Sequence, residues 1–162
     1  MANNSADKSK ITYLHGDQTL LDEVRGLWEE LNRYHCERSE HFKEHYLGMT
    51  WQKRKYTLKK HALGGVLSVE VAVDKSTGQK VAYVISTVDK DGTGEVESIY
   101  VAVAYRRLGI GDQLMRKTLD WMNQNGATAK QVEVSVGNEV TWDFYCRYGF
   151  LPRKTLLKQV KK

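Results

Sequence analysis

Residues 97–111 read ESIYVAVAYRRLGIG, and this stretch decides which fold the chain adopts. Its first half is rich in β-branched and aromatic residues, a composition that favours a β-strand. Two glycines one residue apart, Gly109 and Gly111, follow, and an amphipathic helical pattern starts at Ile110. Glycine lets the backbone approach a ligand closely, and the free N–H groups of a first helical turn attract anions. The stretch therefore predicts a strand, an anion-binding loop and a helix in succession.

Full positive charge in this loop comes from Arg106 and Arg107, which suits it to a pyrophosphate group. The loop has neither the spacing of a P-loop nor the G-x-G-x-x-G spacing of a dinucleotide site. Because R-x-x-G-x-G is short and frequent by chance, a tight turn with two solvated arginines is the alternative interpretation.

The elements on either side of this stretch alternate between helical and strand periodicity. Asp17 is placed to cap a helix that runs to about His35, and residues 37–62 read as helical pieces with a break at Gly48. After the loop, helices are expected from Ile110 to Gly126 and over residues 141–148. Strands are expected over residues 11–14, 66–73, 81–88, 95–103, 131–136 and 151–160, with 81–88 and 95–103 as an antiparallel hairpin. This order predicts an α/β (α+β) fold, a mixed, mostly antiparallel central sheet of about six to seven strands flanked by helices.

The length and composition favour one cytoplasmic domain. With 162 residues, the chain is expected to form a single domain over residues 11–162, preceded by a loose tail over residues 1–10. No apolar run approaches the roughly 18 residues needed to span a bilayer, and the polar first ten residues lack the apolar core of a secretory signal. No membrane partner is therefore expected. A net charge of +5 attracts anions without choosing among them.

Three further groups of residues have the composition of possible sites, but the sequence favours ordinary structural roles for them. Cys36 and Cys146 are far apart in the sequence and are expected to be unpaired, with Cys146 in a buried position. His41 and His45 are four residues apart, but no third ligand is evident, so no metal site is predicted. The densest basic run lies within residues 52–61, where a solvated helix face is preferred over nucleic-acid binding.

A second informative stretch lies at residues 138–150 and reads NEVTWDFYCRYGF. Together with residues 97–111, from which one helix and one strand separate it, this stretch resembles the GNAT superfamily of acetyl-CoA-dependent N-acetyltransferases. The first stretch is similar to the family's strand, pyrophosphate loop and helix start, and the second to its N…FY…GF pattern. Two positions depart from the family: Val103 stands where proline is frequent, and Asp112 stands where a small or basic residue is frequent.

The resemblance implies a GNAT-like fold that uses acetyl-CoA as acetyl donor and holds no metal. In such folds the strand carrying residues 99–103 separates from the strand at residues 131–136, and the pantetheine arm lies in the gap. Ordinary pairing within the sheet is the alternative for these residues. The implied cofactor contacts come from the strand, the loop and the late segment: Ile99, Tyr100, Val101, Val103, Arg106, Arg107, Leu108, Gly109, Ile110, Gly111, Asp112, Asn138 and Tyr145.

The resemblance also implies catalytic roles. An aliphatic amine has a pKa near 10.4, so a base must take its proton at neutral pH. Glu97 matches the family position of that base, and Glu95 on the same strand face is the alternative, either acting directly or through a water. Tyr145 matches a tyrosine that hydrogen-bonds to the leaving thiolate, with packing beside Phe144 as its alternative role. Asn138 either bonds the pantetheine arm or caps the helix after it.

The sequence thus predicts transfer of acetyl from acetyl-CoA to a primary amine by direct attack in a ternary complex. The acceptor is a small-molecule amine or an amine of a protein or peptide, and it is expected to enter between residues 28–50 and the late loops. A non-catalytic acyl-CoA-binding or sensing module on the same fold is the alternative function. No nucleic-acid partner is expected, and a homodimer is left open as the assembly.

Overall fold

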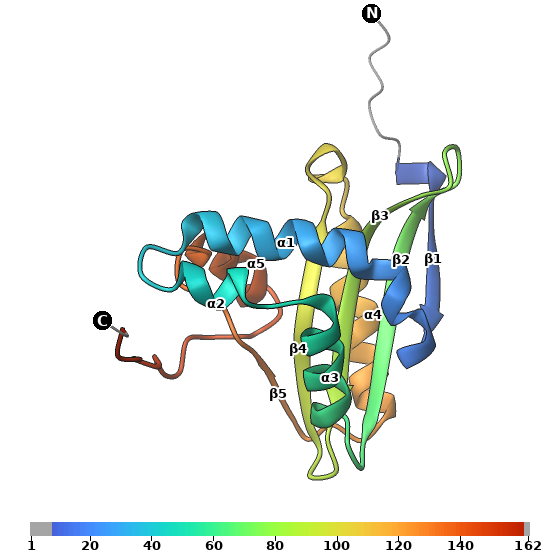
Figure 1. Ribbon diagram of the computed structural model, residues 1–162. Helices are drawn as coiled ribbons and strands as arrows, with labels where there is room; N and C mark the ends of the chain where they lie inside the picture. The colour runs from blue at the N-terminus through green and yellow to red at the C-terminus, as the bar shows by residue number, and fades with distance from the viewer. Residues whose placement is uncertain (1–7, 161–162) are drawn as a thin grey trace, which may run out of the picture.

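Five strands form one sheet in the order β1-β2-β3-β4-β5 within residues 8–160, the part of the chain that the computed structural model describes (Figure 1). The strands are β1 Ile11–Gly16, β2 Val66–Asp74, β3 Gln79–Val88, β4 Thr93–Val101 and β5 Ala129–Val132. Strands β1 to β4 are antiparallel to their neighbours, and β5 runs parallel to β4. The predicted mixed, mostly antiparallel sheet and its β3–β4 hairpin are confirmed.

The sheet is nevertheless smaller than the six to seven strands that the sequence predicts. Residues 151–160 lie exposed outside the sheet, and the strand predicted over residues 131–136 ends at Val132. Pro152 has no N–H to donate to a neighbouring strand. Leu156 and Leu157 are adjacent, so they cannot both face one side of a sheet. The strand predicted over residues 95–103 also ends early, at Val101.

Helices cover both faces of the sheet (Figure 1). Before β2 come the 3₁₀ helix η2 (Gln18–Val24), α1 (Arg25–Arg38), α2 (Lys43–Leu47) and α3 (Trp51–His61). Helix α4 (Ile110–Gln124) covers the other face, and α5 (Trp142–Cys146) follows β5.

The predicted helix boundaries hold in part. The single helix predicted from Asp17 to His35 is two elements, η2 and α1. Asp17 still caps the first of them, because its carboxylate accepts a hydrogen bond of 2.8 Å from the Thr19 N–H. The break at Gly48 is confirmed by the gap between α2 and α3. Residues 1–7 of the predicted tail lie outside the described residues, and Lys8–Lys10 form the 3₁₀ helix η1.

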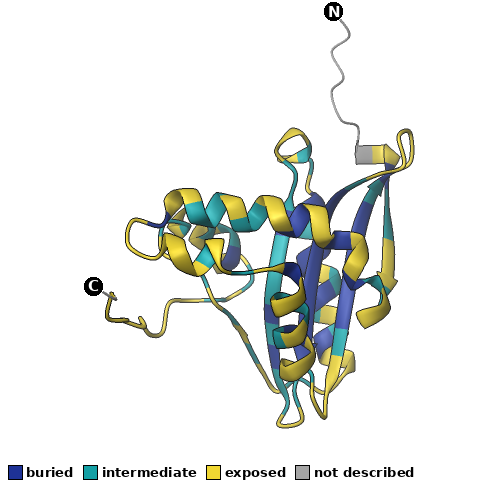
Figure 2. Ribbon diagram, viewed as in Figure 1, coloured by how far each residue is buried: buried dark blue, intermediate teal, exposed yellow. Residues whose placement is uncertain are grey.

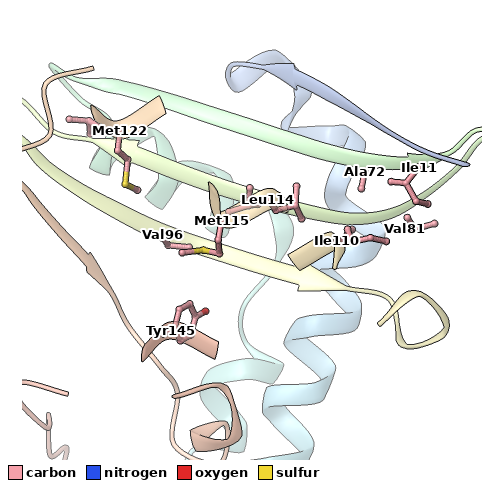
Figure 3. Packing of buried hydrophobic residues seen from close by; sticks show 12 residues of the cluster. Ile11, Ala72, Val81, Val96, Ile110, Leu114, Met115, Met122 and Tyr145 are labelled. Atoms are coloured by element: carbon pink, nitrogen blue, oxygen red, sulfur yellow. The ribbon is translucent and has the colours of Figure 1, made fainter. Parts of the chain in front are cut away.

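Two apolar layers hold the helices to the sheet, one on each face, so the central strands are buried and the outer helix faces are exposed (Figure 2). On the α4 face, Leu114, Met115 and Met122 belong to a buried cluster with Val96 (Figure 3). The opposite face buries apolar residues of η2, α1 and α3 against the strands: Leu21, Val24, Leu27, Trp28, Trp51, Leu58, Val69, Val71, Tyr83, Ile85 and Tyr100.

The feature that positions the site is the point where β5 leaves β4. Pairing between these two strands ends at Val96 and Val132, although β4 continues to Val101. We call this point the vertex. A β-bulge lies directly beside it, because Glu97 is an extra residue of β4 between two residues, Val96 and Ser98, that pair with β3. The strand separation that the family resemblance predicts is therefore confirmed.

Candidate active site

A cleft of about 610 Å³ opens beyond the vertex, between β4, the start of α4 and the segment around α5. Most residues that the sequence predicts for cofactor binding line it: Ile99, Tyr100, Val101, Arg106, Arg107, Gly109, Ile110, Gly111, Asp112, Asn138 and Tyr145. The other lining residues come from α1, from the loop after β4 and from the late segment: Leu31, Tyr34, Tyr105, Val140, Thr141, Phe144 and Arg147. Residues of the two informative stretches of sequence thus line the same cleft.

Two of the predicted cofactor contacts, Val103 and Leu108, do not line the cleft. Val103 lies in the 3₁₀ helix η3 (Val103–Tyr105) and is 71% exposed, because the chain has already left β4 at Val101. Leu108 packs against the apolar cluster under α4. These two residues shape the loop from outside the cleft.

The loop before α4 has the backbone that a close ligand approach requires. Gly109, the N-cap of α4, has a φ of 76°, a left-handed conformation that costs glycine little. Arg107 has a φ of 62°, and it is the one non-glycine residue with positive φ in residues 8–160. A Cβ atom on Gly111 would lie 3.4 Å from the Phe144 ring, so it would already be in van der Waals contact with the cleft wall. The first turn of α4, with its free N–H groups, lines the cleft as a positive helix end.

Arg106 holds the backbone that the cofactor is expected to meet. Its Nε donates a hydrogen bond of 3.0 Å to the Val101 carbonyl oxygen, and its guanidinium lies 5.6 Å from the centre of the Tyr100 ring. The Tyr100 hydroxyl in turn donates to a Glu30 carboxylate oxygen at 3.1 Å. Burial is the main cause that raises the pKa of Tyr100. A carbonyl assigned to pantetheine by the family resemblance is therefore occupied by a loop arginine.

Asp112 carries the negative charge that departs from the family pattern, and two neighbours engage it. Its carboxylate accepts a hydrogen bond from Arg116 Nε at 2.8 Å and one from the Tyr148 hydroxyl at 2.5 Å. These bonds, with Arg116 first, hold the pKa of Asp112 below its usual range. The same contacts tie the segment after α5 to the first turn of α4, so Asp112 acts as a structural link in the cleft wall.

Tyr145 projects from α5 toward the part of the α4 cluster that contains Val96 and Met115 (Figure 3). It is 8% exposed and packs edge-on against Phe144 at 5.3 Å between ring centres, as predicted. We find no hydrogen bond to its hydroxyl within residues 8–160, although Tyr145 lines the cleft. Burial raises the pKa of Tyr145 to about 12. The residue is thus a protonated donor at neutral pH.

Asn138 also lines the cleft, and its side chain makes no capping hydrogen bond. The turn after it is instead closed by its backbone carbonyl, which accepts from the Thr141 N–H at 3.0 Å and from the Thr141 hydroxyl at 2.8 Å. The capping alternative is therefore not used, and the amide group remains for a ligand.

The two candidate bases lie on the α3 side of the sheet at the vertex. Glu97 has a side chain only 2% exposed, and three neighbours donate to its carboxylate: Arg54 at 3.3 Å, His61 at 2.8 Å and Thr87 at 3.0 Å. Glu95 accepts one hydrogen bond, from Gln131 at 2.8 Å. Burial, reinforced by the charge of Glu97, raises the pKa of Glu95. Neither carboxylate lines the large cleft, so the role of base stays a prediction for both.

Sequence reasoning missed Arg54 and His61, which it placed on a solvated basic face of α3. The helical spacing could have indicated that these two side chains face the sheet. Positions 54, 58 and 61 share one face of a helix, and Leu58 is fully buried. Leu31 and Tyr34 of α1 form one wall of the cleft, and both fall within residues 28–50, beside which the sequence predicts that the acceptor enters.

The described residues provide no metal-binding group and no paired cysteine that would add to the site. Among residues 8–160, no three His, Cys, Asp or Glu side chains are grouped so that they could hold a metal ion. Both cysteines are free, and Cys146 is exposed rather than buried, because it points away from the inward-facing Tyr145 beside it. Within the same described range, we find no helix with the length and apolarity that a membrane crossing needs.

Known proteins match this chain in sequence and in fold. The family model for the acetyltransferase (GNAT) family matches residues 25–150. An uncharacterized N-acetyltransferase of Methanocaldococcus jannaschii is 30% identical over 81 residues, which are 48% of this chain and 36% of that relative. The chain therefore matches about a third of the length of this relative.

Solved structures share the fold at low identity. A GCN5-related N-acetyltransferase from Ralstonia eutropha superposes with a TM-score of 0.70 at 18% identity, over 93% of this chain and 98% of that one. The aminoglycoside N-acetyltransferase AAC(6')-Iy in complex with CoA superposes with a TM-score of 0.60 at 16% identity, over 93% and 99% of the two chains. Because the family model spans most of the chain and the fold agrees, the chain belongs to the GNAT acetyltransferase family.

Proposed function

We propose that this chain is an acetyl-CoA-dependent N-acetyltransferase, which transfers acetyl to a primary amine by direct attack in a ternary complex. The observation that carries the proposal is the cleft that begins where β5 leaves β4 and ends at the glycine loop of α4. Acetyl-CoA has an anionic pyrophosphate at one end of an amide-containing arm and a thioester at the other. The cleft offers a positive helix end, a free strand edge and a buried tyrosine in the same order.

The donor would bind along this cleft in an extended form. Its pyrophosphate would rest on the first turn of α4 at Gly109 and Gly111, with Arg106 and Arg107 adding charge. The pantetheine arm would bond to the free edge of β4 and to the Asn138 amide. For this to happen, Arg106 must release the Val101 carbonyl that it bonds at 3.0 Å. The release would turn the guanidinium from a backbone partner into a phosphate partner.

The chemical step needs a neutral amine and a stabilised thiolate. The amine nitrogen attacks the thioester carbonyl carbon, a C–N bond forms, and the C–S bond breaks with its electron pair on sulfur. Tyr145 would hydrogen-bond that sulfur. With a thiol pKa of about 8.5 and the Tyr145 pKa at about 12, outright transfer of the phenol proton is uphill, so hydrogen bonding suffices as its role. Glu97, or Glu95 beside it, would act as the base that removes the amine proton, directly or through an intervening group.

The acceptor would be a small-molecule amine. AAC(6')-Iy has been seen with a bisubstrate analog, CoA-S-monomethyl-acetylneamine, in which an aminoglycoside fragment is joined to CoA. That fold neighbour supports a small amine as the acceptor. Leu31 and Tyr34 on α1 form one wall of the donor cleft.

The proposal is tested by release of free CoA thiol from acetyl-CoA in the presence of a panel of primary amines. The panel holds small aliphatic amines, aminoglycosides, amino acids and a short peptide, and mass spectrometry identifies the N-acetyl product. We expect thiol and N-acetyl amine to form in equal amounts with at least one small amine. Tight binding of acetyl-CoA with no product from any amine would instead indicate an acyl-CoA-binding module.

A further inference from the structure

A second, smaller hollow of about 250 Å³ lies on the α3 side of the vertex, separate from the donor cleft. Six residues line it: His61, Thr87, Asp89, Thr93, Glu95 and Gln131. Glu95 and Gln131 are a registered pair of β4 and β5, one position before the pairing ends at Val96. The hollow thus lies within one residue pair of the vertex, the point beyond which the donor cleft opens. At about 30 Å³ per water-sized group, it has room for a small aliphatic amine.

Glu97 is poorly placed to take a proton itself. Its side chain is 2% exposed, and it lies beneath α3. One carboxylate oxygen accepts from His61 at 2.8 Å and from Thr87 at 3.0 Å, and the other faces Arg54 at 3.3 Å. Arg54 also donates to the Glu97 backbone oxygen at 2.7 Å, which holds the bulge in place. The carboxylate is therefore enclosed by its own partners.

His61, the last residue of α3, is the exposed end of this network. Its Nδ1 bonds the Glu97 carboxylate at 2.8 Å, and its side chain is 44% exposed. An ionised carboxylate only accepts, so the proton of this bond lies on Nδ1, and Nε2 is left with a free lone pair. His61 lines the hollow, whereas Glu97 does not. The charged groups around it are Arg54 on α3, Glu95 and Glu97 on β4, and Asp89 in the β3–β4 turn. Lys59 and Lys60 share the last turn of α3 with it.

We propose that the acceptor amine binds in this hollow and that His61 Nε2 takes its proton, with Glu97 as the positioning residue that orients the imidazole. This inference rests on the proposed function. The substrate class is a small primary amine that arrives as an ammonium ion, because Asp89 and Glu95 line the hollow with carboxylates.

The ammonium ion gives one proton to His61 Nε2 and becomes a neutral amine, whose lone pair attacks the thioester carbon. When the C–S bond breaks, the thiolate leaves with the electron pair and hydrogen-bonds to Tyr145. The remaining excess proton on nitrogen passes to sulfur, and the imidazolium returns its proton to water. The products are the N-acetyl amine, the free thiol and one proton.

The decisive variant is His61→Gln, in which the amide keeps a hydrogen-bonding group near Glu97 and leaves no proton acceptor of comparable basicity. We expect turnover at neutral pH to fall about 10²–10⁴-fold, with the acetyl-CoA dissociation constant unchanged and the acid limb of the pH–rate profile lost. His41→Gln is the matched control, because His41 is exposed in the loop before α2 and lines neither the donor cleft nor the smaller hollow. It should keep full turnover.

Glu97→Gln separates a positioning role from direct catalysis. If Glu97 only orients His61, turnover should fall in part and the acid limb should persist, because the imidazole still takes the proton. If Glu97 is the base, the limb should vanish in Glu97→Gln and persist in His61→Gln, which would overturn the proposal. Should the buried Glu97→Gln variant not fold, the half-exposed His61→Gln variant decides alone.

Failure of this inference and failure of the proposed function give different results. A wild-type protein with turnover that survives His61→Gln overturns the role of His61 alone. A wild-type protein that binds acetyl-CoA and acetylates no amine overturns both.

Discussion

At the scale of single residues, Tyr145 allows the most direct test of the proposed chemistry. Its hydroxyl makes no hydrogen bond within the described residues, and burial raises its pKa to about 12. Thiolate charge develops only as the C–S bond breaks, so the hydroxyl stabilises the transition state more than the bound donor. Tyr145→Phe should lower turnover about tenfold with little change in acetyl-CoA affinity.

This defect should persist up to about pH 10, because a phenol with its pKa near 12 stays protonated there. Steady-state kinetics across pH measure the effect, and thermal unfolding confirms that the Phe144–Tyr145 ring contact survives. Full turnover in Tyr145→Phe with every accepted amine would leave the tyrosine with a packing role only.

Arg106 is the second residue with a separable role, since it bonds the Val101 carbonyl in the structure described here. Arg106→Ala should raise the KM for acetyl-CoA about fivefold, roughly 1 kcal/mol, and should leave the KM for the amine nearly unchanged. Arg25→Ala is the charge-matched control, because Arg25 pairs with Glu29 at the start of α1. Dephospho-CoA should show the same loss as acetyl-CoA if the target is the pyrophosphate; a loss confined to the 3′-phosphorylated form would assign Arg106 to the other end of the cofactor.

At the scale of elements, the start of α4 is the part of the cleft that a side chain would block. A Cβ at Gly111 would already lie 3.4 Å from Phe144, so Gly111→Val should fill the space that the pyrophosphate needs. We expect acetyl-CoA binding to weaken at least tenfold, about 1.4 kcal/mol. Gly26→Ala is the control, because a Cβ at Gly26 on α1 meets no atom within 4 Å. Calorimetry with undiminished binding in a folded Gly111→Val variant would contradict the phosphate-loop assignment.

The link between α4 and the segment after α5 gives a pH-dependent prediction. Hydrogen bonds from Arg116 and Tyr148 lower the pKa of Asp112 in the folded protein. A carboxylate with a lowered pKa stabilises the fold fully above its unfolded value of about 3.9 and loses this effect as pH falls through the folded value. Asp112→Asn should therefore lower Tm at pH 7 by about 2–4 °C, since the 36% exposure of Asp112 limits the effect to about 1 kcal/mol.

The difference in Tm between the wild type and Asp112→Asn should disappear in acid, where the Asp112 carboxyl of the wild type is protonated. Asp120→Asn removes an equal charge from the exposed side of α4 and should change Tm little at either pH. A Tm gap that stays constant down to about pH 2 would show that Asp112 contributes through packing and not through its charge.

Local sequence patterns predicted most elements, and pairwise contacts explain what they missed. The strands at β2 to β4 have runs of β-branched residues, and the glycine loop has its own signature, so both were predictable. The bulge at Glu97 depends on contacts with Arg54 and His61, which are 43 and 36 residues away. No local pattern reports such contacts. The cleft residues of the two quoted stretches were predictable from their local motifs, whereas the sequence placed the α1 wall only within the broad range of residues 28–50.

At the scale of the whole molecule, residues 151–160 stand apart from the fold. They are exposed throughout and lie outside the five-stranded sheet, with Leu156 and Leu157 each more than 70% exposed. A chain that ends after Phe150 should therefore keep its Tm within about 2 °C of the full chain, because little buried surface is lost. A fall of several degrees would show that this segment pairs after all, as the sequence pattern predicts for a strand, for example with a second copy.

The separation of β4 and β5 is the feature of the whole molecule on which the account depends. The donor cleft opens beyond this point, and the smaller hollow lies beside it on the α3 side. Both stretches that identify the family, 97–111 and 138–150, contribute to the donor cleft. Under the proposed function, donor, acceptor and proton-transfer groups would meet at the vertex.

The most direct test of this account is a crystal structure of the protein with CoA at saturating concentration. We predict that the pyrophosphate lies on the first turn of α4 at Gly109–Gly111, that the pantetheine arm runs between β4 and Asn138, and that the sulfur lies within hydrogen-bonding reach of Tyr145. Arg106 should have left the Val101 carbonyl. A structure with CoA bound elsewhere, or with the cleft empty while calorimetry shows saturation, would contradict the account.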